Sequence, residues 1–436
     1  MKAIHVLNHF LPQQTAGTEV YTWALSKALL ELNYDIKVLI PNYGSTTNET
    51  YNFDGLSVIK FSDPTTIDRQ LILGQKHSLG IDSFCRILEL ERPDIIHFHE
   101  IGSGNGVTLN HLITAKNLGF KVLVTFHLAG YSCMTGGLIN SKNQMCEGNY
   151  DLYNCTKCVL SKKGIKIGNS ILSEVSVLLR KSEISTLRWN NRLGTLLGTS
   201  EIIHSHNTRL HQIIKFSDRV VTLTDWYKEV LIKNRVEEKK IRTVYQGLST
   251  YENLELRSKK NNQTLNLVYV GRITEIKGIH ILIKAVQSIK DKKITLSIYG
   301  EDDNTNYGAE LRLKTKSNIN IFWKGKIPTN RVRDEISKYN LLCLCTTITE
   351  MSPLVFLEAR SVGVPIIASD VLGNRKLIED KINGFLFDFN SYKSLRNKLL
   401  EIFNNPCLLN QVNVFEKEIR TFKDIALEYS KIYSEL

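Results

Sequence analysis

The chain has 436 residues, which is too long for one ordinary hydrophobic core and predicts two or three domains. Apolar residues make up 42% of it and charged residues 23%, and no apolar run approaches the roughly 18 residues of a membrane-spanning helix, so the composition is typical of a globular protein and excludes a transmembrane one. The net charge of +12 favours an anionic partner: nucleic acid, an anionic lipid surface and a phosphorylated small molecule all fit.

The chain starts with MKAIHVLNHF, which predicts a first strand because it lacks the basic segment and long apolar run of a secretory signal. We therefore expect a cytoplasmic protein. In such a protein, eight cysteines indicate buried thiols or a metal site, not a disulfide framework.

The first half alternates short apolar strands with helical stretches. Strands are predicted at residues 3–10, 35–41, 93–99 and 121–127, and a helix with apolar residues at helical spacing at 19–33. This alternation indicates a parallel sheet covered on both faces.

Residues 159–200 are basic and amphipathic. They hold seven lysines and arginines against two acids, Glu174 and Glu183, which gives a net charge of +5. The apolar residues of one helical face are Ile171, Leu172, Val175, Leu178 and Leu179. The pattern fits a contact with an anionic membrane surface, and it also fits a helix that packs on its own domain with a solvated basic face.

The same alternation restarts after residue 264. Strands are predicted at 265–272, 294–300, 318–325, 341–347, 365–370 and 384–388, and helices at 278–290, 329–339 and from about Leu354. The polar stretch 248–264 is the predicted linker. We expect a first domain over 1–247 and a second over 265–410, both doubly wound α/β units with a ligand cleft between them, and a C-terminal helix over 411–436 that packs back on the first domain.

Glycines and cations stand together in VYVGRITEIKGIH. Gly271 and Arg272 end a predicted strand, and Lys277 and Gly278 begin the next helix. Glycine lets a ligand approach the backbone, and a guanidinium with an ammonium can hold a diphosphate. Taken alone, the pattern also fits a strand-end turn with solvated charges.

The stretch TEMSPLVFLEA, residues 349–359, places two acids around a short apolar run. Ser352 and Pro353 are typical first-turn residues, and a helix start of this kind can bind an anion or a sugar hydroxyl. The residues predicted to bind a ligand there are Met351, Ser352, Pro353, Leu354 and Val355.

The two acids, Glu350 and Glu358, can each accept hydrogen bonds from a pair of hydroxyls. We expect Glu350 to project into the cleft and Glu358 to lie deeper along the helix. The general acid/base pair of a hydrolase is the other interpretation. Arg272 and Lys277 disfavour it because they indicate a phosphorylated ligand.

These motifs resemble a known family. Arg272 with Lys277, and Glu350-x7-Glu358 followed by ARSVGVPIIASD and NGFLFD, are similar to the donor domain of retaining GT4 glycosyltransferases. That family has the GT-B fold, in which two Rossmann-like domains face an interdomain cleft. The resemblance covers most of the chain and is strongest over 265–390. It implies a nucleotide-diphosphate sugar donor, with Arg272 and Lys277 on the diphosphate, Glu350 on the donor sugar and Glu358 on the ribose.

The first half agrees with the resemblance. FLPQQTAGTEVYTWALSKAL is similar to the family's glycine-rich loop and first helix, with Gly17 letting the backbone approach the donor phosphate and the acceptor. TFHLAG matches a T-x-H strand end, which implies that His127 lines the reaction centre. PDIIHFHE matches an H-x-H strand end, and for His97 and His99 a structural role fits equally well.

Three departures from the family pattern concern donor contacts and not the fold. Ala16 replaces the first glycine of the loop, Gln246-Gly247 replaces Asn-Gly at the domain junction, and Arg375 with Lys376 replaces Pro-Glu after VLGN.

The resemblance implies retention of anomeric configuration and no catalytic metal, so no cofactor is expected for the chemistry. Departure of the nucleoside diphosphate is expected to depend on Arg272, Lys277 and the helix-start amides. The catalytic residues expected are His127, Glu350, Arg272 and Lys277. No side-chain base is assigned.

Four cysteines cluster in a polar insertion over about 131–160. The pattern Cys133-x12-Cys146-x8-Cys155-x2-Cys158 ends with a usual zinc-chelate spacing, and a metal would order a loop that lacks a core. Similar insertions occur in some GT4 members. We predict a structural zinc site that shapes acceptor recognition; the alternatives are reduced unliganded thiols, disulfides or an iron–sulfur cluster.

The sequence thus predicts a hexosyltransferase that builds a cell-surface polysaccharide or a lipid-linked glycan, cytoplasmic and peripheral on the inner face of the membrane. A GT-B nucleotide-sugar epimerase and a non-catalytic subunit of a glycan synthesis complex are the alternatives. Nucleic acid is the weakest candidate partner, because no recognised motif accompanies the basic charge.

Overall fold

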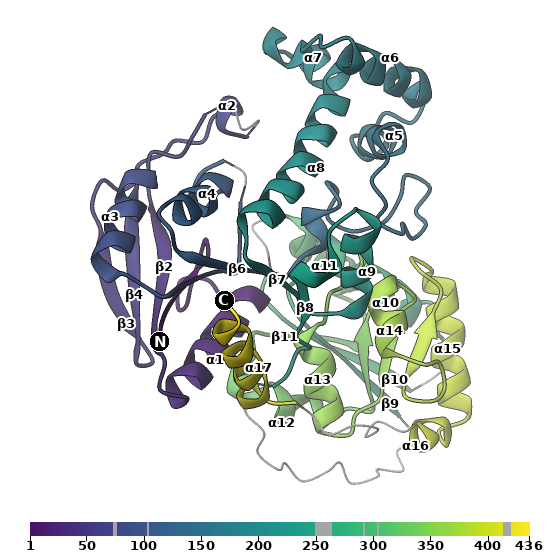
Figure 1. The fold of residues 1–436 in the computed structure, drawn as a ribbon. Helices are drawn as coiled ribbons and strands as arrows, with labels where there is room; N and C mark the ends of the chain where they lie inside the picture. Colours follow the sequence, from purple (N-terminus) through teal and green to yellow (C-terminus); the bar gives the residue numbers. More distant parts are fainter. Residues whose placement is uncertain (73–75, 103, 249–263, 291–292, 303–304, 413–419) are drawn as a thin grey trace. The chain divides into compact units, whose positions relative to one another are not determined.

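The computed structural model describes residues 1–72, 76–102, 104–248, 264–290, 293–302, 305–412 and 420–436 (Figure 1). The chain divides into two compact units: unit 1 is Met1–Ser249 with Thr421–Leu436, and unit 2 is Thr250–Arg420. Most of the predicted linker, residues 249–263, lies outside the described residues.

Unit 1 is built on an eight-stranded sheet in the order β3-β4-β2-β1-β5-β6-β7-β8. Neighbouring strands are parallel except β3 and β4, which are antiparallel. The strands are β1 (Lys2–Val6), β2 (Asp35–Tyr43), β3 (Glu49–Phe53), β4 (Leu56–Asp63), β5 (Ile95–Phe98), β6 (Lys121–Phe126), β7 (Arg219–Thr222) and β8 (Ile241–Thr243). The four strands predicted from apolar runs, β1, β2, β5 and β6, are confirmed.

The β3–β4 hairpin at the edge of this sheet was not predicted. Its turn is formed by Asp54 and Gly55, whose φ angles are 49° and 81°. An Asp-Gly pair adopts two positive φ angles readily and is typical of a two-residue hairpin turn. That dipeptide was the signal in the sequence.

The helices of unit 1 cover the sheet and extend beyond it. They are α1 (Gly17–Glu31), α2 (Arg69–Ile72), α3 (Ile81–Glu91), α4 (Leu109–Asn117), α5 (Leu152–Lys162), α6 (Asn169–Lys181), α7 (Arg192–Leu197), α8 (Thr199–Phe216), α9 (Asp225–Lys233) and α17 (Phe422–Ser434), with short 3-10 helices at η1 (Ala129–Tyr131), η2 (Thr186–Trp189) and η3 (Glu238–Lys240).

The C-terminal helix α17 packs beside α1 within unit 1 (Figure 1). The Tyr21 hydroxyl of α1 donates to the Tyr429 hydroxyl over 3.1 Å. The Tyr433 hydroxyl lies 3.1 Å from His5 Nε2 and 2.9 Å from His97 Nδ1. Because these groups are buried, the hydrogen bonds fix α17 against the central strands.

Helices α5 to α7, with η2 and the first residues of α8, form what we call the helical arm, residues 152–200. Figure 1 shows α8 running away from the unit 1 sheet, with α6 and α7 at its far, N-terminal end. None of the described helices of either unit is long and apolar enough to cross a membrane.

Unit 2 is built on a six-stranded, wholly parallel sheet in the order β11-β10-β9-β12-β13-β14. Its strands are β9 (Leu265–Val270), β10 (Ile294–Tyr299), β11 (Ile321–Gly325), β12 (Leu341–Leu344), β13 (Ile366–Ser369) and β14 (Phe385–Phe387). Its helices are α10 (Ile279–Gln287), α11 (Tyr307–Thr315), α12 (Val332–Ile336), α13 (Leu354–Ser361), α14 (Leu372–Leu377), α15 (Tyr392–Asn404) and α16 (Leu408–Gln411), with 3-10 helices η4 (Glu275–Lys277) and η5 (Thr329–Arg331).

Every strand predicted for the second half is confirmed, and α13 begins at Leu354 as predicted. The reason is that most of these strands are buried on both faces, so they appear in the sequence as short apolar runs; the edge strand β11, which exposes Phe322, is the exception. Each unit is therefore a doubly wound α/β fold of the Rossmann-like kind.

Candidate functional site

The predicted anion-binding residues of unit 2 come together at one edge of its sheet. Arg272 and Lys277 follow β9, and Glu350 follows β12, which is the parallel neighbour of β9. Lys277 Nζ donates to Glu350 Oε1 over 2.6 Å. The side chains of Lys277 and Glu350 are 26% and 17% exposed, so the pair is reachable from solvent and partly desolvated. Ligands of open parallel sheets bind at this edge, outside the carboxyl ends of the strands.

Tyr269 of β9 lies beside these charges. Its hydroxyl donates to the backbone oxygen of Arg272 over 2.7 Å. Burial raises the pKa of Tyr269 well above its usual value, the negative charge of Glu350 raises it further, and the positive charge of Arg272 lowers it. The charges of Arg272 and Glu350, the two residues predicted to bind the ligand, therefore both act on the Tyr269 hydroxyl.

The backbone brings the two loops together through a required glycine. Gly278 has φ +68°, and a side chain there would overlap the carbonyl oxygen of Cys345 at the end of β12. The Thr347 N–H donates to the Ile276 carbonyl over 2.8 Å, and the Thr346 hydroxyl donates to the same oxygen over 3.1 Å. The loops that carry Lys277 and Glu350 are thus joined by hydrogen bonds.

The backbone of Glu350 lies against α14. A side chain at Gly373, in the first turn of α14, would overlap the Glu350 carbonyl oxygen, so only glycine fits this approach. After Glu350 the chain enters α13, whose N-cap residue is Pro353 and whose N-terminus has no side-chain cap. The residues predicted to bind a ligand lie there, Met351 buried and Ser352, Pro353, Leu354 and Val355 half-buried.

Glu358 lies one turn into α13 and is half-buried. Burial raises its pKa to about 7, and the positive charge of Arg333 opposes that shift. Among the described residues, its carboxyl makes neither a hydrogen bond nor an ion pair with the Lys277–Glu350 pair. Glu358 is therefore a separate part of this edge and titrates near neutral pH.

Three buried polar atoms near these loops have no hydrogen-bond partner in the described part of the chain: Thr274 Oγ1, Thr349 Oγ1 and Asn374 Oδ1. Thr274 lies between Arg272 and Lys277, Thr349 precedes Glu350, and Asn374 follows Gly373. A buried polar atom without a partner is costly, so such atoms indicate a place where a ligand supplies the missing bond. Sequence reasoning missed them, although two of them adjoin the predicted residues.

In unit 1, Gly17 is the first residue of α1, and a methyl group built on it would meet no atom within 4 Å. Packing within the unit therefore does not require glycine here, and the space beside it is open to a ligand. One turn further along α1, the ring of Tyr21 packs edge-on against His127, with ring centroids 4.8 Å apart.

His127 follows β6 and is buried. Burial lowers its pKa to about 3, so the imidazole is neutral at physiological pH. Its Nε2 lies 3.2 Å from His99 Nδ1, which fixes the ring. A neutral, fixed imidazole can donate and accept hydrogen bonds but carries no charge of its own.

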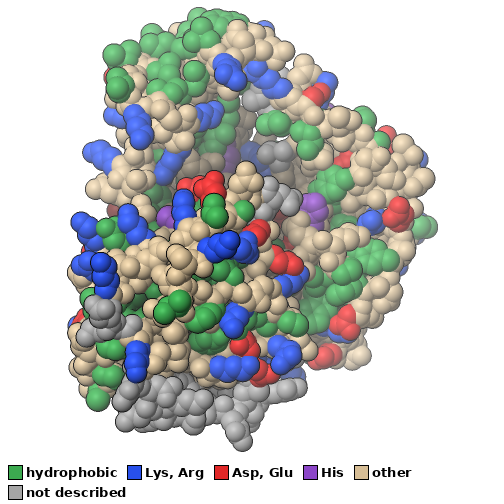
Figure 2. Space-filling view, turned by 180° about the vertical axis from the view of Figure 1, so that it is seen from behind, with side chains coloured by type: hydrophobic (Ala, Val, Ile, Leu, Met, Phe, Trp, Pro, Cys, Tyr) green, Lys and Arg blue, Asp and Glu red, His purple; other side chains and the backbone are tan. Residues whose placement is uncertain are grey.

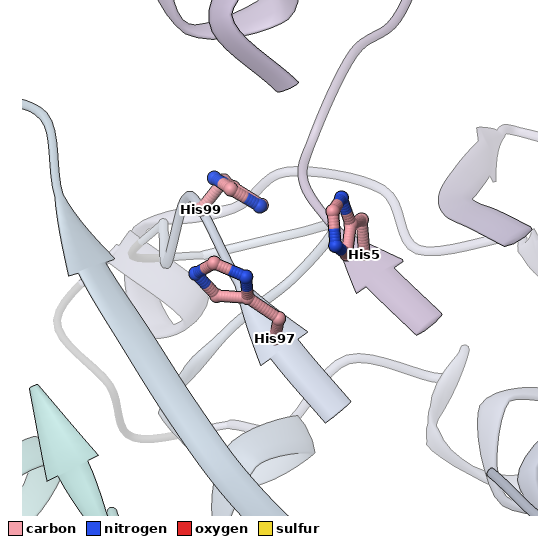
Figure 3. Close-up of side chains that lie close together, drawn as sticks. All are labelled: His5, His97 and His99. Carbon is pink, nitrogen blue, oxygen red and sulfur yellow. The ribbon is translucent and has the colours of Figure 1, made fainter. Parts of the chain in front are cut away.

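The other strand-end histidines form a buried group with His5, shown in Figure 3. One ligand atom from each of His5, His97 and His99 lies within 4.8 Å of the others, a spacing that could hold a metal ion. Hydroxyls already occupy both ring nitrogens of His5 (Ser26 and Tyr433) and both of His97 (Tyr433 and Thr125). We therefore assign His5 and His97 to the hydrogen-bonded core.

Glu19, in the first turn of α1, is a candidate that sequence reasoning missed. It is buried, Gln14 Nε2 donates to its Oε1 over 2.5 Å, and its Oε2 has no partner in the described structure. Burial raises its pKa, and the nearby charge of Glu100 adds to this. The signal in the sequence was an acid two residues after Gly17, on the helix face that the structure buries.

The four cysteines of the insertion share one neighbourhood of unit 1. Burial raises the pKa of Cys155 to about 11, and Cys146 and Cys133 raise it further; burial, Cys133 and Cys146 also raise the pKa of Cys158. All four thiols are free, and no three of their sulfurs lie within 4.8 Å of one another. The four thiols therefore lie near one another, but their sulfurs are farther apart than in a tetrahedral zinc site.

Two family models match the chain. "Glycosyltransferase Family 4" matches residues 15–146, and "Glycosyl transferases group 1" matches residues 252–421. The first therefore falls within unit 1 and the second covers nearly all of unit 2.

Three known proteins illustrate the similarity. An uncharacterized glycosyltransferase of Methanocaldococcus jannaschii is 27% identical over 242 residues, which are 51% of this chain and 60% of the relative. The UDP-Gal:alpha-D-GlcNAc-diphosphoundecaprenol alpha-1,3-galactosyltransferase of Escherichia coli is 30% identical over 133 residues, 28% of this chain and 33% of that protein. The chain thus matches less than two thirds of the length of either relative. The solved structure of Anabaena HepE in complex with UDP-glucose has a TM-score of 0.62 at 13% identity, with 100% of both chains covered, and shows the same fold.

Proposed function

Because the chain belongs to the GT4 glycosyltransferases, which have the GT-B fold, we propose that it transfers a hexose from a nucleotide-diphosphate sugar to a glycan or lipid-linked acceptor. The observation that carries the proposal is the Lys277–Glu350 pair, with Arg272 nearby, at the carboxyl ends of β9 and β12. Two cations beside one carboxylate suit a ligand that has both phosphates and hydroxyls.

Donor binding rearranges this pair. In the structure Glu350 forms an ion pair with Lys277. A diphosphate takes over the Lys277 ammonium, and the released Glu350 carboxylate accepts hydrogen bonds from the hydroxyls of the donor sugar. Glu358 accepts hydrogen bonds from the ribose hydroxyls in its ionised form.

The same residues assist departure of the nucleoside diphosphate. The bond between the sugar C1 and the diphosphate oxygen breaks, and negative charge grows on the diphosphate, which Arg272, Lys277 and the uncapped start of α13 stabilise. The acceptor oxygen bonds C1 on the same face, and the departing phosphate oxygen takes its proton. Retention of configuration and chemistry without a catalytic metal are parts of this proposal.

His127 and Gly17 of unit 1 serve the same reaction. The neutral His127 donates a hydrogen bond to the donor sugar and does not act as a base, because burial keeps its pKa near 3. The open space beside Gly17 admits the donor phosphate or the acceptor.

Two relatives support a finer description. The Escherichia coli relative is named for a uridine diphosphate galactose donor and a diphosphoundecaprenol-linked acceptor, and the Anabaena structure holds UDP-glucose. We therefore propose a uridine diphosphate hexose as donor and a lipid-linked acceptor at the cytoplasmic face of a membrane. The four clustered cysteines are proposed to hold a structural zinc, which would order the insertion.

The test supplies purified protein with radiolabelled UDP-hexoses and a bacterial lipid extract. The proposal predicts that label enters the lipid fraction as nucleoside diphosphate is released, and that neither happens with donor alone. An epimerase would interconvert the donor without any lipid, and a non-catalytic subunit would bind the donor without turnover; either result contradicts the proposal.

A further inference from the structure

Helix α6 of the helical arm has its faces reversed relative to an ordinary surface helix. Its buried residues are two serines, Ser173 and Ser176, and its exposed face carries Ile171, Val175 and Leu178. These three apolar residues stand at helical spacing, and Ile171 and Leu178 are 68% and 64% exposed. A helix in water normally buries such a stripe, so this stripe indicates a second apolar phase outside the protein.

The reversal is fixed by specific hydrogen bonds. The Ser200 N–H of α8 donates to Ser176 Oγ over 2.9 Å, and the Ser200 hydroxyl donates to the Ser176 carbonyl over 2.6 Å. The Ser173 hydroxyl donates to the Asn169 carbonyl within the helix. The two bonds with Ser200 hold the polar face of α6 on α8, so the helix cannot turn its apolar stripe inward without breaking them.

Other apolar residues of the arm are also exposed. They are Ile167, which is 95% exposed, and Ile184, Trp189 and Leu193. Figure 2 shows green apolar side chains at the top of the view, in the region of the arm, with blue lysines and arginines beside them. Tryptophan is favoured at the boundary between water and lipid, because its ring is apolar and its N–H is polar.

The arm is also positively charged and its charges are available. The exposed basic residues are Lys162, Lys163, Lys166, Lys181, Arg188 and Arg192, with Lys157 and Arg180 half-buried. In the part of the chain that the structure describes, none of the eight forms an ion pair with a carboxylate. The opposing acids are Glu174 and Glu183.

We propose that the helical arm docks on an anionic lipid bilayer, with Ile167, Ile171 and Leu178 inserted among the acyl chains near the headgroups and the lysines on the anionic phosphates. An apolar stripe flanked by unpaired cations matches such a surface. A second copy of the arm is the poorer occupant, because two arms of net charge +6 repel each other. That the bilayer presents the acceptor rests on the proposed function; the docking itself does not.

Flotation of the full chain with vesicles tests the docking without donor or acceptor. Vesicles of phosphatidylcholine with phosphatidylglycerol should bind the wild type, more weakly at high salt, and pure phosphatidylcholine should bind it far less. The triple variant Ile167→Ser, Ile171→Ser, Leu178→Ser should lose at least about tenfold in partitioning. Lys162→Gln, Lys166→Gln, Lys181→Gln should lose about tenfold or more on anionic vesicles.

Matched controls make the same chemical changes elsewhere. Leu90, Leu313 and Ile319 are also strongly exposed, and their triple serine variant should bind as the wild type does. Lys316, Lys393 and Lys423 are exposed, and their glutamine variant controls for net charge. All these side chains are exposed, so circular dichroism and melting temperature should stay unchanged.

Binding of the arm variants at wild-type strength, equal binding to neutral and anionic vesicles, or arm-dependent dimerisation in sedimentation without vesicle binding would each overturn the proposal. Flotation is read without turnover, so vesicle binding with no glycosyl transfer would leave the docking in place and reject the proposed function. Glycosyl transfer without vesicle binding would leave the proposed function in place and reject the docking.

Discussion

Lys277 Nζ lies 2.6 Å from Glu350 Oε1, although 73 residues separate them in the chain. The two strands that precede these residues, β9 and β12, are parallel neighbours, so their carboxyl ends deliver a cation and an acid to the same point. Lys277 and Glu350 are each other's partner in the structure, and we propose that donor binding exchanges one partner of each residue. This exchange is the central claim of the account.

Removal of a charged residue at this edge should abolish most of the activity and leave the fold intact. We expect Arg272→Ala and Glu350→Ala each to reduce kcat by roughly a hundredfold or more, since each loses a contact that strengthens in the transition state. The exposed ion pair Lys381–Glu401 offers a matched control: Lys381→Ala removes a cation from unit 2 and should leave kcat unchanged. Unchanged turnover in Arg272→Ala or Glu350→Ala, measured by release of nucleoside diphosphate, would reject the site.

Glu358 should make stability depend on pH. Its pKa of about 7 in the folded protein is above the value of about 4.3 of an unfolded glutamate, so its contribution is greatest below the unfolded pKa and is lost as the pH rises to about 7. Between pH 5 and pH 8 the free energy of unfolding of the wild type should therefore fall by roughly 2 kcal/mol relative to that of Glu358→Gln. Melting temperatures of both proteins across this range test it, with the exposed Glu229→Gln as control. Parallel curves for wild type and Glu358→Gln would contradict the raised pKa.

His127 should contribute through hydrogen bonding and not through titration. Since its pKa is about 3, the pH profile of kcat between pH 5 and 8 should keep its shape in His127→Gln while its height falls about tenfold or more. His127→Ala should fall further, because glutamine retains a donor and an acceptor. If the substitution removes an inflection near neutral pH, His127 is ionising and the neutral assignment is wrong.

Metal analysis tests the cysteine cluster. Protein purified under reducing conditions should contain about one zinc per chain, and Cys155→Ser with Cys158→Ser should lose the metal and lower the melting temperature. Cys85→Ser with Cys407→Ser removes two thiols outside the cluster and should keep the zinc. Wild-type protein free of zinc, with four titratable thiols in the insertion, would show that the cluster holds no metal.

Much of the fold and of the unit 2 edge was predictable because the signals are local. Apolar runs mark the buried strands, and the glycines and charges stand next to strand ends. The direct contact between Lys277 and Glu350 was not, because it depends on β12 being the neighbour of β9, which the pattern of either strand does not encode. The close packing that requires glycine at Gly278 and Gly373 was not predictable either, since the oxygens that exclude a side chain there come from distant residues.

Unit 1 shows the same limit. The H-x-H strand end was compatible with a functional or a structural role for His97. The structural role follows from its hydrogen bond with Tyr433 of α17, which lies 336 residues away in the chain. Glu19 was passed over because a helix-face acid is usually solvated, and only the packing shows it buried. The reversed faces of α6 required the position of Ser200 on α8, which the apolar spacing of α6 alone does not give.

The most direct test of the central claim is calorimetric titration of UDP and of a UDP-hexose into the wild type, Lys277→Ala and Glu350→Ala. The account predicts that Lys277→Ala weakens both ligands about tenfold or more, and that Glu350→Ala weakens the UDP-hexose while UDP binds as well as before or more tightly, because Lys277 is freed for the diphosphate. Equal weakening of UDP and UDP-hexose in Glu350→Ala, or undiminished binding of both in Lys277→Ala, would contradict the exchange.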